Sequence, residues 1–204
     1  MSTDERREQL LSAGVELFSR RGHDEVSIED IADAAGVSKG LLYHYFPTKK
    51  DFVLAALARG QEQLAERLRP DPDLDPVAQL DRSLDAFLDY VEEHAGAYTA
   101  IFRRGGGGDP DIAAALDAAR GEQMERMLTA LGGWEEAPVS TERSAELEAA
   151  VQGWTFFLEG AVLRQLEHGG LERAQLRALL RSALVGSVYA AAAAEAAATE
   201  GVHV

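Results

Sequence analysis

The chain has 204 residues, of which 46% are hydrophobic and 27% are charged, a composition typical of a folded globular protein. It contains no cysteine, which excludes disulfides, thiolate zinc sites and thiol nucleophiles. The amino terminus is charged, and the longest wholly apolar run, Ala190–Ala194, is far shorter than the roughly 20 residues that span a bilayer. We therefore expect a cytoplasmic protein with no secretory signal and no membrane partner.

Charge is distributed unevenly along the sequence. The net charge is −15 at pH 7; residues 1–50 hold 7 basic and 9 acidic residues, and the remaining 154 hold 13 and 26. Within Val37–Lys50, the lysines Lys39, Lys49 and Lys50 occur with no acidic residue, a local charge of +3. An acidic protein with one basic patch disfavours diffuse binding to polyanions and permits a focused contact with nucleic acid.

The first two predicted helices are separated by a short loop. Residues 6–20 place an apolar row on one helical face. Ser27 is placed to cap a second helix, with Asp30 as the acid of a capping box. Gly36 suits the end of that helix, because only glycine adopts positive φ at low cost.

Two more helices and a stiff break follow. Ser38 begins a short third helix, which Pro47 must stop. Thr48 caps a fourth helix, again with an acid, Asp51, in the capping-box position. Three prolines in Pro70–Pro76 then interrupt the helical pattern, which predicts a boundary between structural parts.

Apolar residues recur at helical spacing in five further segments. These are residues 77–91, 98–102, 110–131, 144–167 and 171–198. No segment alternates as a strand does, so the predicted fold is all-α with about nine helices. We divide the chain at residue 50, into residues 1–50 and residues 51–204.

The stretch Ser27–Asp51 carries the functional signal. Two short helices joined by a tight turn at Gly36 and Val37 form a helix-turn-helix pattern. Its apolar positions lock the helices together, which leaves one face of the second helix free to enter a major groove. The residues expected on that face are Lys39, Gly40, Tyr43 and His44.

Residues 10–55, through VSKGLLYHYFPTKKD, resemble the DNA-binding domain of TetR-family transcriptional regulators. The resemblance implies base contacts from Lys39, Gly40, Tyr43 and His44, and phosphate contacts from Ser27, Ser38, Tyr45, Thr48 and Lys49. The competing interpretation is that these residues serve the fold alone. A YHYF tetrad more often packs in a core than contacts nucleic acid, and a helix cap contributes about 1 kcal/mol of stability by itself. Both roles are compatible at the capping residues.

The resemblance implies that residues 1–50 form a three-helix helix-turn-helix DNA-binding domain and residues 51–204 a helical bundle for ligand binding and dimerisation. The bundle would hold a cavity for a small-molecule effector. Aromatic and methionine side chains suit such sites, which are mostly apolar. The predicted ligand-binding set is Phe87, Tyr90, Val91, Tyr98, Phe102, Gln123, Met124, Met127, Trp154, Phe157 and Leu158. At any single position, core packing is the competing interpretation. His94 and Arg120 are further candidates for polar contacts.

The last two helices are predicted to form a homodimer surface, because residues 144–167 carry apolar side chains on two faces. Gly105–Gly108 is interpreted as a hinge, since no phosphate-loop motif surrounds it. The sequence shows no histidine, aspartate and glutamate cluster at metal-ligand spacing and no serine, histidine and aspartate arrangement typical of catalysis. We therefore expect no metal, no cofactor and no enzymatic activity.

Together these features predict a ligand-responsive repressor that binds palindromic double-stranded DNA as a dimer. A small, largely apolar or aromatic effector would release it from the operator. Two other classes stay open: an all-α enzyme that uses the bundle cavity, and an interaction module that keeps the helix-turn-helix without reading DNA.

Overall fold

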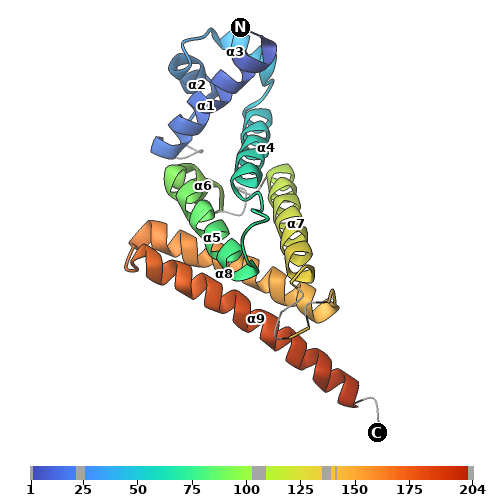
Figure 1. Ribbon diagram of the computed structural model, residues 1–204. Helices are drawn as coiled ribbons and strands as arrows, with labels where there is room; N and C mark the ends of the chain where they lie inside the picture. Colours follow the sequence, from blue (N-terminus) through green and yellow to red (C-terminus); the bar gives the residue numbers. More distant parts are fainter. Residues whose placement is uncertain (1, 22–25, 103–108, 135–138, 141, 202–204) are drawn as a thin grey trace. The chain divides into compact units, whose positions relative to one another are not determined.

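The computed structural model describes residues 2–21, 26–102, 109–134, 139–140 and 142–201, and every regular element within these ranges is an α-helix, as predicted (Figure 1). The helices are α1 (Thr3–Arg21), α2 (Ile28–Ala34), α3 (Lys39–Tyr45), α4 (Lys49–Arg67), α5 (Pro76–Glu93), α6 (Ala95–Phe102), α7 (Pro110–Gly132), α8 (Ala145–His168) and α9 (Arg173–Gly201). The predicted glycine hinge at 105–108 lies outside the described residues.

The chain packs as two compact units. Unit 1 comprises Met1–Arg69 with Phe87–Asp117, and unit 2 comprises Pro70–Ala86 with Ala118–Val204. Helices α5 and α7 therefore each contribute residues to both units. The predicted boundary at residue 50 separates two functions, whereas these units are defined by packing. That boundary stays a prediction.

The core of unit 1 joins the helix-turn-helix to parts of α1, α4, α6 and α7. Its buried members include Leu10, Phe18, Ile31, Leu42, Phe46, Phe52, Ala97, Ile112 and Leu116. The ring of Phe52 meets Phe46 at 4.9 Å and Phe18 at 5.7 Å between ring centroids, both edge-on. Because these three rings come from three segments of the chain, their contact fixes α1, the end of α3 and α4 together.

The helix starts in unit 1 are built as the sequence predicted. Capping boxes are present at Ser27 with Asp30 and at Thr48 with Asp51. The Ser38 hydroxyl accepts a hydrogen bond from the backbone N–H of Leu41 at 3.2 Å. In the turn after α2, φ is 67° at Gly36, which gives the left-handed conformation expected there.

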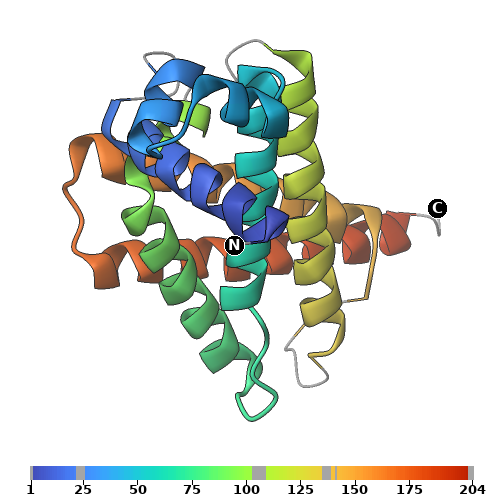
Figure 2. The ribbon, with the colours of Figure 1, turned by 90° about the horizontal axis from the view of Figure 1, so that it is seen from above.

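Unit 2 is organised around α8 and α9, which run side by side in opposite directions (Figure 1 and Figure 2). The buried residues of the two helices are Leu147, Val151, Trp154, Thr155, Leu158 and Val162 on α8, and Leu176, Leu180, Leu184, Val188 and Ala191 on α9. The indole N–H of Trp154 donates to the carbonyl of Leu180 at 2.9 Å, so this buried polar group is satisfied.

By length and composition alone, the segment Arg173–Ala198 of α9 is apolar enough to cross a membrane. Within unit 2, however, its arginines pair with acids of α5: Arg177 with Asp85, and Arg181 with Asp81 at 2.8 Å. Its buried apolar row packs against α8. In the most apolar window of this segment, 28% is buried. The ion pairs and the packed row are those of a helix in a bundle, and they explain why α9 combines arginines with apolar residues.

Gly14 gives a direct test of the Phe52 contact. A Cβ atom added at Gly14 would lie 2.2 Å from Cζ of Phe52, so Gly14→Ala must displace the buried ring. We expect this variant to lose about 1–3 kcal/mol of unfolding free energy.

The matched control is Gly121→Ala in α7, where an added Cβ meets nothing within 4 Å. Because alanine is the better helix former, we expect this control to be neutral or more stable by up to about 1 kcal/mol. Urea unfolding at one fixed protein concentration measures both. Equal losses in the two variants would contradict the proposed role of the aromatic contact.

Candidate functional site

The outer face of α3 is exposed. Lys39, Gly40, Tyr43 and His44 are all exposed, and 43% of the Tyr43 surface is accessible. Leu42, on the opposite face of the same short helix, is completely buried in the core of unit 1. The helix therefore presents four of the predicted DNA-contacting residues to solvent while its apolar side anchors it.

A shallow, open depression brings residues of three segments together beside α3. It is lined by Val26, Ser27, Ile28, Glu29, Tyr43, Pro47, Thr48 and Lys49. Four of these, Ser27, Tyr43, Thr48 and Lys49, belong to the set of predicted DNA contacts. The structure thus gathers side chains that are up to 22 positions apart in sequence on one surface.

Tyr45 has a different environment from the other predicted DNA contacts. Its side chain is half-buried and packs against the core of unit 1. Its ring lies edge-on to His44 at 5.5 Å and tilted against Phe46 at 6.5 Å. Ser38 is exposed, and its hydroxyl serves as the cap of α3.

The structure corrects the interpretation of Val37–Lys50 as a patch of three uncompensated positive charges. The ammonium of Lys39 lies 3.5 Å from the carboxylate of Glu29. Lys50 is hydrogen-bonded to Asp111 and lies 3.8 Å from Asp109. The sequence did not reveal these partners, because the first is ten positions away on another helix and the others are about sixty positions away.

Both pairs shift the pKa of an exposed group. A backbone hydrogen bond and then the charge of Lys39 hold the pKa of the Glu29 carboxyl below its ordinary value. The hydrogen bond to Asp111, followed by the charges of Asp109 and Asp111, raises the pKa of the Lys50 ammonium. Glu29 is therefore an anion within the depression, beside the amino-terminal end of α3.

Five members of the predicted ligand-binding set belong to unit 1. Val91 and Tyr98 are buried, and Phe87, Tyr90 and Phe102 are partly buried. The rings of Tyr98 and Phe102 stack at 4.3 Å, and Phe87 meets Tyr98 edge-on at 6.4 Å. These rings form a continuous aromatic group on α5 and α6.

Tyr90 is the centre of a cluster of titratable groups. Its ring lies 4.6 Å from that of His94, and the guanidinium of Arg67 lies 5.3 Å from its centroid. Arg67 also donates to Glu93 at 2.5 Å. Burial raises the pKa of the Tyr90 phenol and lowers the pKa of His94, so both groups are held in their neutral forms. No sequence motif indicated this cluster, because Arg67 reaches it from α4.

The other six members of the set belong to unit 2. Trp154 and Leu158 are buried, Gln123, Met124 and Met127 are partly buried, and Phe157 is 41% exposed. Arg120, a further polar candidate, is engaged with Glu159 through two hydrogen bonds of 2.8 and 2.9 Å. Because the predicted set is divided between two units, its common cavity stays a prediction.

No group of three or more histidine, cysteine, aspartate or glutamate side chains suited to a metal ion occurs among the described residues.

Two parts of the chain match known protein families. Residues 10–56 match the bacterial regulatory proteins of the tetR family, and residues 76–187 match the tetracyclin repressor-like C-terminal domain. Together these matches cover the helix-turn-helix and most of the helices that follow it. The chain belongs to the TetR family, a family of transcriptional regulators rather than enzymes.

Individual relatives and a solved structure agree with this assignment. The chain is 36% identical over 118 residues to the transcriptional activator FasR of Mycolicibacterium smegmatis, covering 57% of this chain and 54% of FasR. It is 30% identical over 124 residues to the transcriptional repressor KstR of Rhodococcus jostii, covering 61% and 58%. The match thus spans little more than half the length of either relative.

A crystal structure of a tetR-family transcriptional regulator from Streptomyces coelicolor has a TM-score of 0.82 and 34% identity to this chain. The superposition covers 95% of this chain and 84% of that protein.

The lowered pKa of His94 predicts a specific pH dependence of stability. Folding favours the neutral imidazole, so this contribution is present above the ordinary pKa of 6.5 and is lost as pH falls below it. The unfolding free energy of the wild type should therefore decrease between about pH 7.5 and pH 5.5, and His94→Gln should remove part of that decrease.

Urea unfolding of both proteins at the two pH values measures the difference. His94→Gln also removes the ring contact with Tyr90, which lowers stability by a similar amount at both pH values. An identical pH dependence in the two proteins would show that His94 is not the titrating group.

Proposed function

We propose that this protein is a ligand-responsive repressor, located in the cytoplasm, that binds a palindromic operator as a homodimer. The observation that carries the proposal is the exposed face of α3, which lies beside the depression lined by Ser27, Tyr43, Thr48 and Lys49 and is anchored by the buried Leu42. A helix anchored in this way fits a major groove, with its amino-terminal residues at the base edges.

The exposed side chains suit two kinds of DNA contact. Lys39 can donate to guanine O6 and N7, Gly40 lets the backbone approach closely, and Tyr43 and His44 offer rings with one polar tip each. Ser27, Ser38, Thr48, Lys49 and the hydroxyl of Tyr45 suit phosphate oxygens. Because Glu29 lies beside Lys39, its carboxylate disfavours phosphate near that position and favours Lys39 in a base-reading role.

The outer sides of α8 and α9 support the homodimer. Phe156, Leu179 and Tyr189 are large apolar or aromatic side chains, and each is more than 40% exposed. Exposed apolar residues of this kind on the two packed helices of unit 2 suit a self-complementary surface. Two symmetry-related subunits would present two copies of α3 to the two halves of a palindrome.

For the effector, we propose a small, largely apolar or aromatic molecule held by the predicted ligand-binding set. The stacked rings of Tyr98 and Phe102 and the polar groups of Tyr90 and His94 suit a ligand of this kind. In the proposed mechanism, effector binding shifts α4 and with it the spacing of the two copies of α3. Coupling of about 1–3 kcal/mol would weaken operator binding by roughly 5–150-fold.

Repression is the direction we propose, and KstR is a named repressor. Activation is the second candidate, because FasR is a named activator. A reporter gene placed behind the selected operator distinguishes them: co-expression of the protein lowers reporter output if it represses and raises it if it activates.

Selection from a random-sequence DNA pool tests the proposal as a whole. We expect purified protein at about 150 mM salt to enrich a palindrome, because two symmetric copies of α3 read equivalent half-sites. Sequencing of the bound fragments gives the operator directly. A folded protein that enriches no sequence would overturn the DNA-binding proposal.

Substitutions at Tyr43 and Lys49 should separate base reading from phosphate contact. Tyr43→Ala should reduce affinity for the selected operator by roughly 5–100-fold and leave binding to unrelated DNA nearly unchanged. Lys49→Ala should weaken binding to all sequences to a similar extent and reduce the slope of log affinity against log salt by about 1. Titration of operator and scrambled DNA at several salt concentrations measures both effects. Equal loss of specificity in the two variants would contradict this division of roles.

A further inference from the structure

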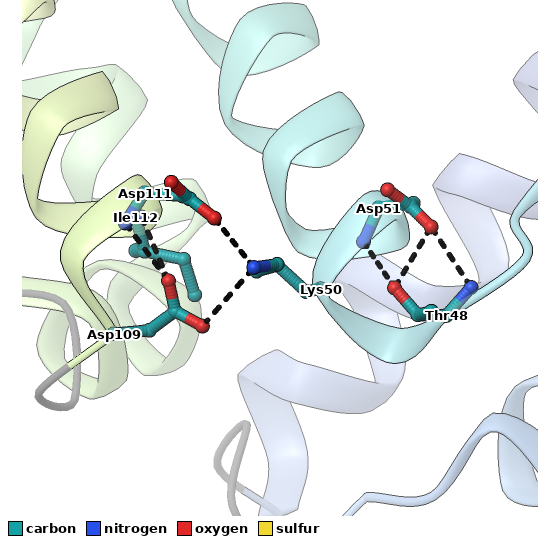
Figure 3. A network of polar contacts seen from close by, with 6 residues as sticks. All are labelled: Thr48, Lys50, Asp51, Asp109, Asp111 and Ile112. Atoms are coloured by element: carbon teal, nitrogen blue, oxygen red, sulfur yellow. Dashed lines mark hydrogen bonds and ion pairs between the residues drawn. The ribbon is translucent and has the colours of Figure 1, made fainter.

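Lys50 connects the first turn of α4 to the first turn of α7. Its ammonium is hydrogen-bonded to the carboxylate of Asp111 and lies 3.8 Å from that of Asp109 (Figure 3). All three residues belong to unit 1, although 61 positions separate Lys50 from Asp111. We refer to this three-residue contact as the Lys50 clamp.

One end of the Lys50 clamp adjoins the proposed DNA-binding surface. Thr48, the cap of α4, and Lys49, the first residue of the helix, both line the depression beside α3. Lys50 follows directly, and Figure 3 shows its side chain directed to Asp109 and Asp111, while the capping box of Thr48 and Asp51 lies at the same helix start. Movement of Lys50 would therefore move both proposed phosphate contacts.

The other end of the Lys50 clamp lies at the capped start of α7. Asp109 accepts hydrogen bonds from the backbone N–H groups of Asp111 at 2.9 Å and of Ile112 at 3.4 Å, so it caps α7. One turn further, Ile112 and Leu116 are buried in the same core as the helix-turn-helix. The two carboxylates thus lie at a capped helix start whose next apolar residues are buried.

We propose that Lys50, Asp109 and Asp111 are positioning residues for DNA binding: they hold the first turn of α4 so that Thr48 and Lys49 meet the phosphate backbone. This proposal rests on the proposed DNA-binding function. Lys50 itself is not a phosphate contact, because its ammonium is already occupied by two carboxylates, which would also repel a nearby phosphate.

The Lys50 clamp also gives α7 a role in the response to an effector. Helix α7 is continuous from Pro110 to Gly132, with its first eight residues in unit 1 and the remainder in unit 2. A displacement of α7 along its axis would move Asp111 relative to Lys50 and disturb the first turn of α4. In the proposed response to an effector, the start of α7 would then act on the DNA-binding surface in addition to α4.

A charge exchange tests the positioning role. Lys50→Asp and Asp111→Lys each break the ion pair, which should cost about two- to fivefold in operator affinity at roughly 50 mM salt, where exposed ion pairs are least screened. The two variants change the net charge in opposite directions, so that effect cancels when their changes in affinity are combined. The double variant carries the same pair in reverse and the same net charge as the wild type. We expect it to bind within about twofold of the wild type, which is a clear departure from additivity.

Lys49→Ala and Lys50→Met are the matched comparison, since they remove adjacent positive charges. Lys49→Ala should reduce the salt slope by about 1, whereas Lys50→Met should lower affinity without changing that slope. Circular dichroism melts establish that every variant is folded at the temperature of the binding measurement. A merely structural contact would lower the melting temperature of Lys50→Met and leave operator affinity unchanged.

The possible outcomes are distinguishable. If Lys50→Met reduces the salt slope as Lys49→Ala does, or if the charge exchange is additive, the positioning role is wrong while the proposed function stands. If Lys50→Met melts earlier but binds operator normally, the contact is structural only, and the positioning role is again wrong. A wild-type protein that selects no DNA overturns the proposed function and the positioning role together.

Discussion

The ring of Phe52 lies edge-on between Phe18 of α1 and Phe46 at the end of α3, and the packing of unit 1 depends on this contact. Gly14 makes it possible, because any side chain there would occupy the space of the Phe52 ring. The same core includes Leu42, whose burial fixes which face of α3 is left exposed. An apolar contact that never meets DNA thus determines the orientation of the proposed DNA-reading surface.

Electrostatics adds a second constraint to this surface. The protein carries a net charge of −15, and two of the three lysines near α3 have acidic partners: Glu29 for Lys39, and Asp109 with Asp111 for Lys50. Among the phosphate contacts that we propose, Lys49 is the charged side chain, so we expect nonspecific attraction to DNA to be weak. Under the proposed function, operator binding would depend on base contacts and on accurate placement of a few groups, and this dependence gives the start of α7 its proposed importance.

Local features of the helix-turn-helix were predictable residue by residue. The capping boxes at Ser27 and Thr48 and the positive φ of Gly36 depend on interactions within four residues. The local sequence is therefore sufficient to predict them. The chain's membership of the TetR family likewise followed from residues 10–55 and was confirmed by the family matches. The ion pairs of Lys39 and Lys50, in contrast, join different helices, and the spacing of charges in sequence carries no information about them.

The amino-acid sequence by itself determined an all-α fold, the helix starts, the helix-turn-helix and the exposed face of α3, because helical periodicity, capping and turn chemistry are local properties. Tertiary structure alone decided that parts of α6 and α7 complete the core of the helix-turn-helix, that Arg67 joins Tyr90 and His94, and that two lysines of the basic stretch are compensated. The physical reason is that burial and ion pairing depend on which side chains the packed helices bring within a few ångströms, whatever their separation in sequence.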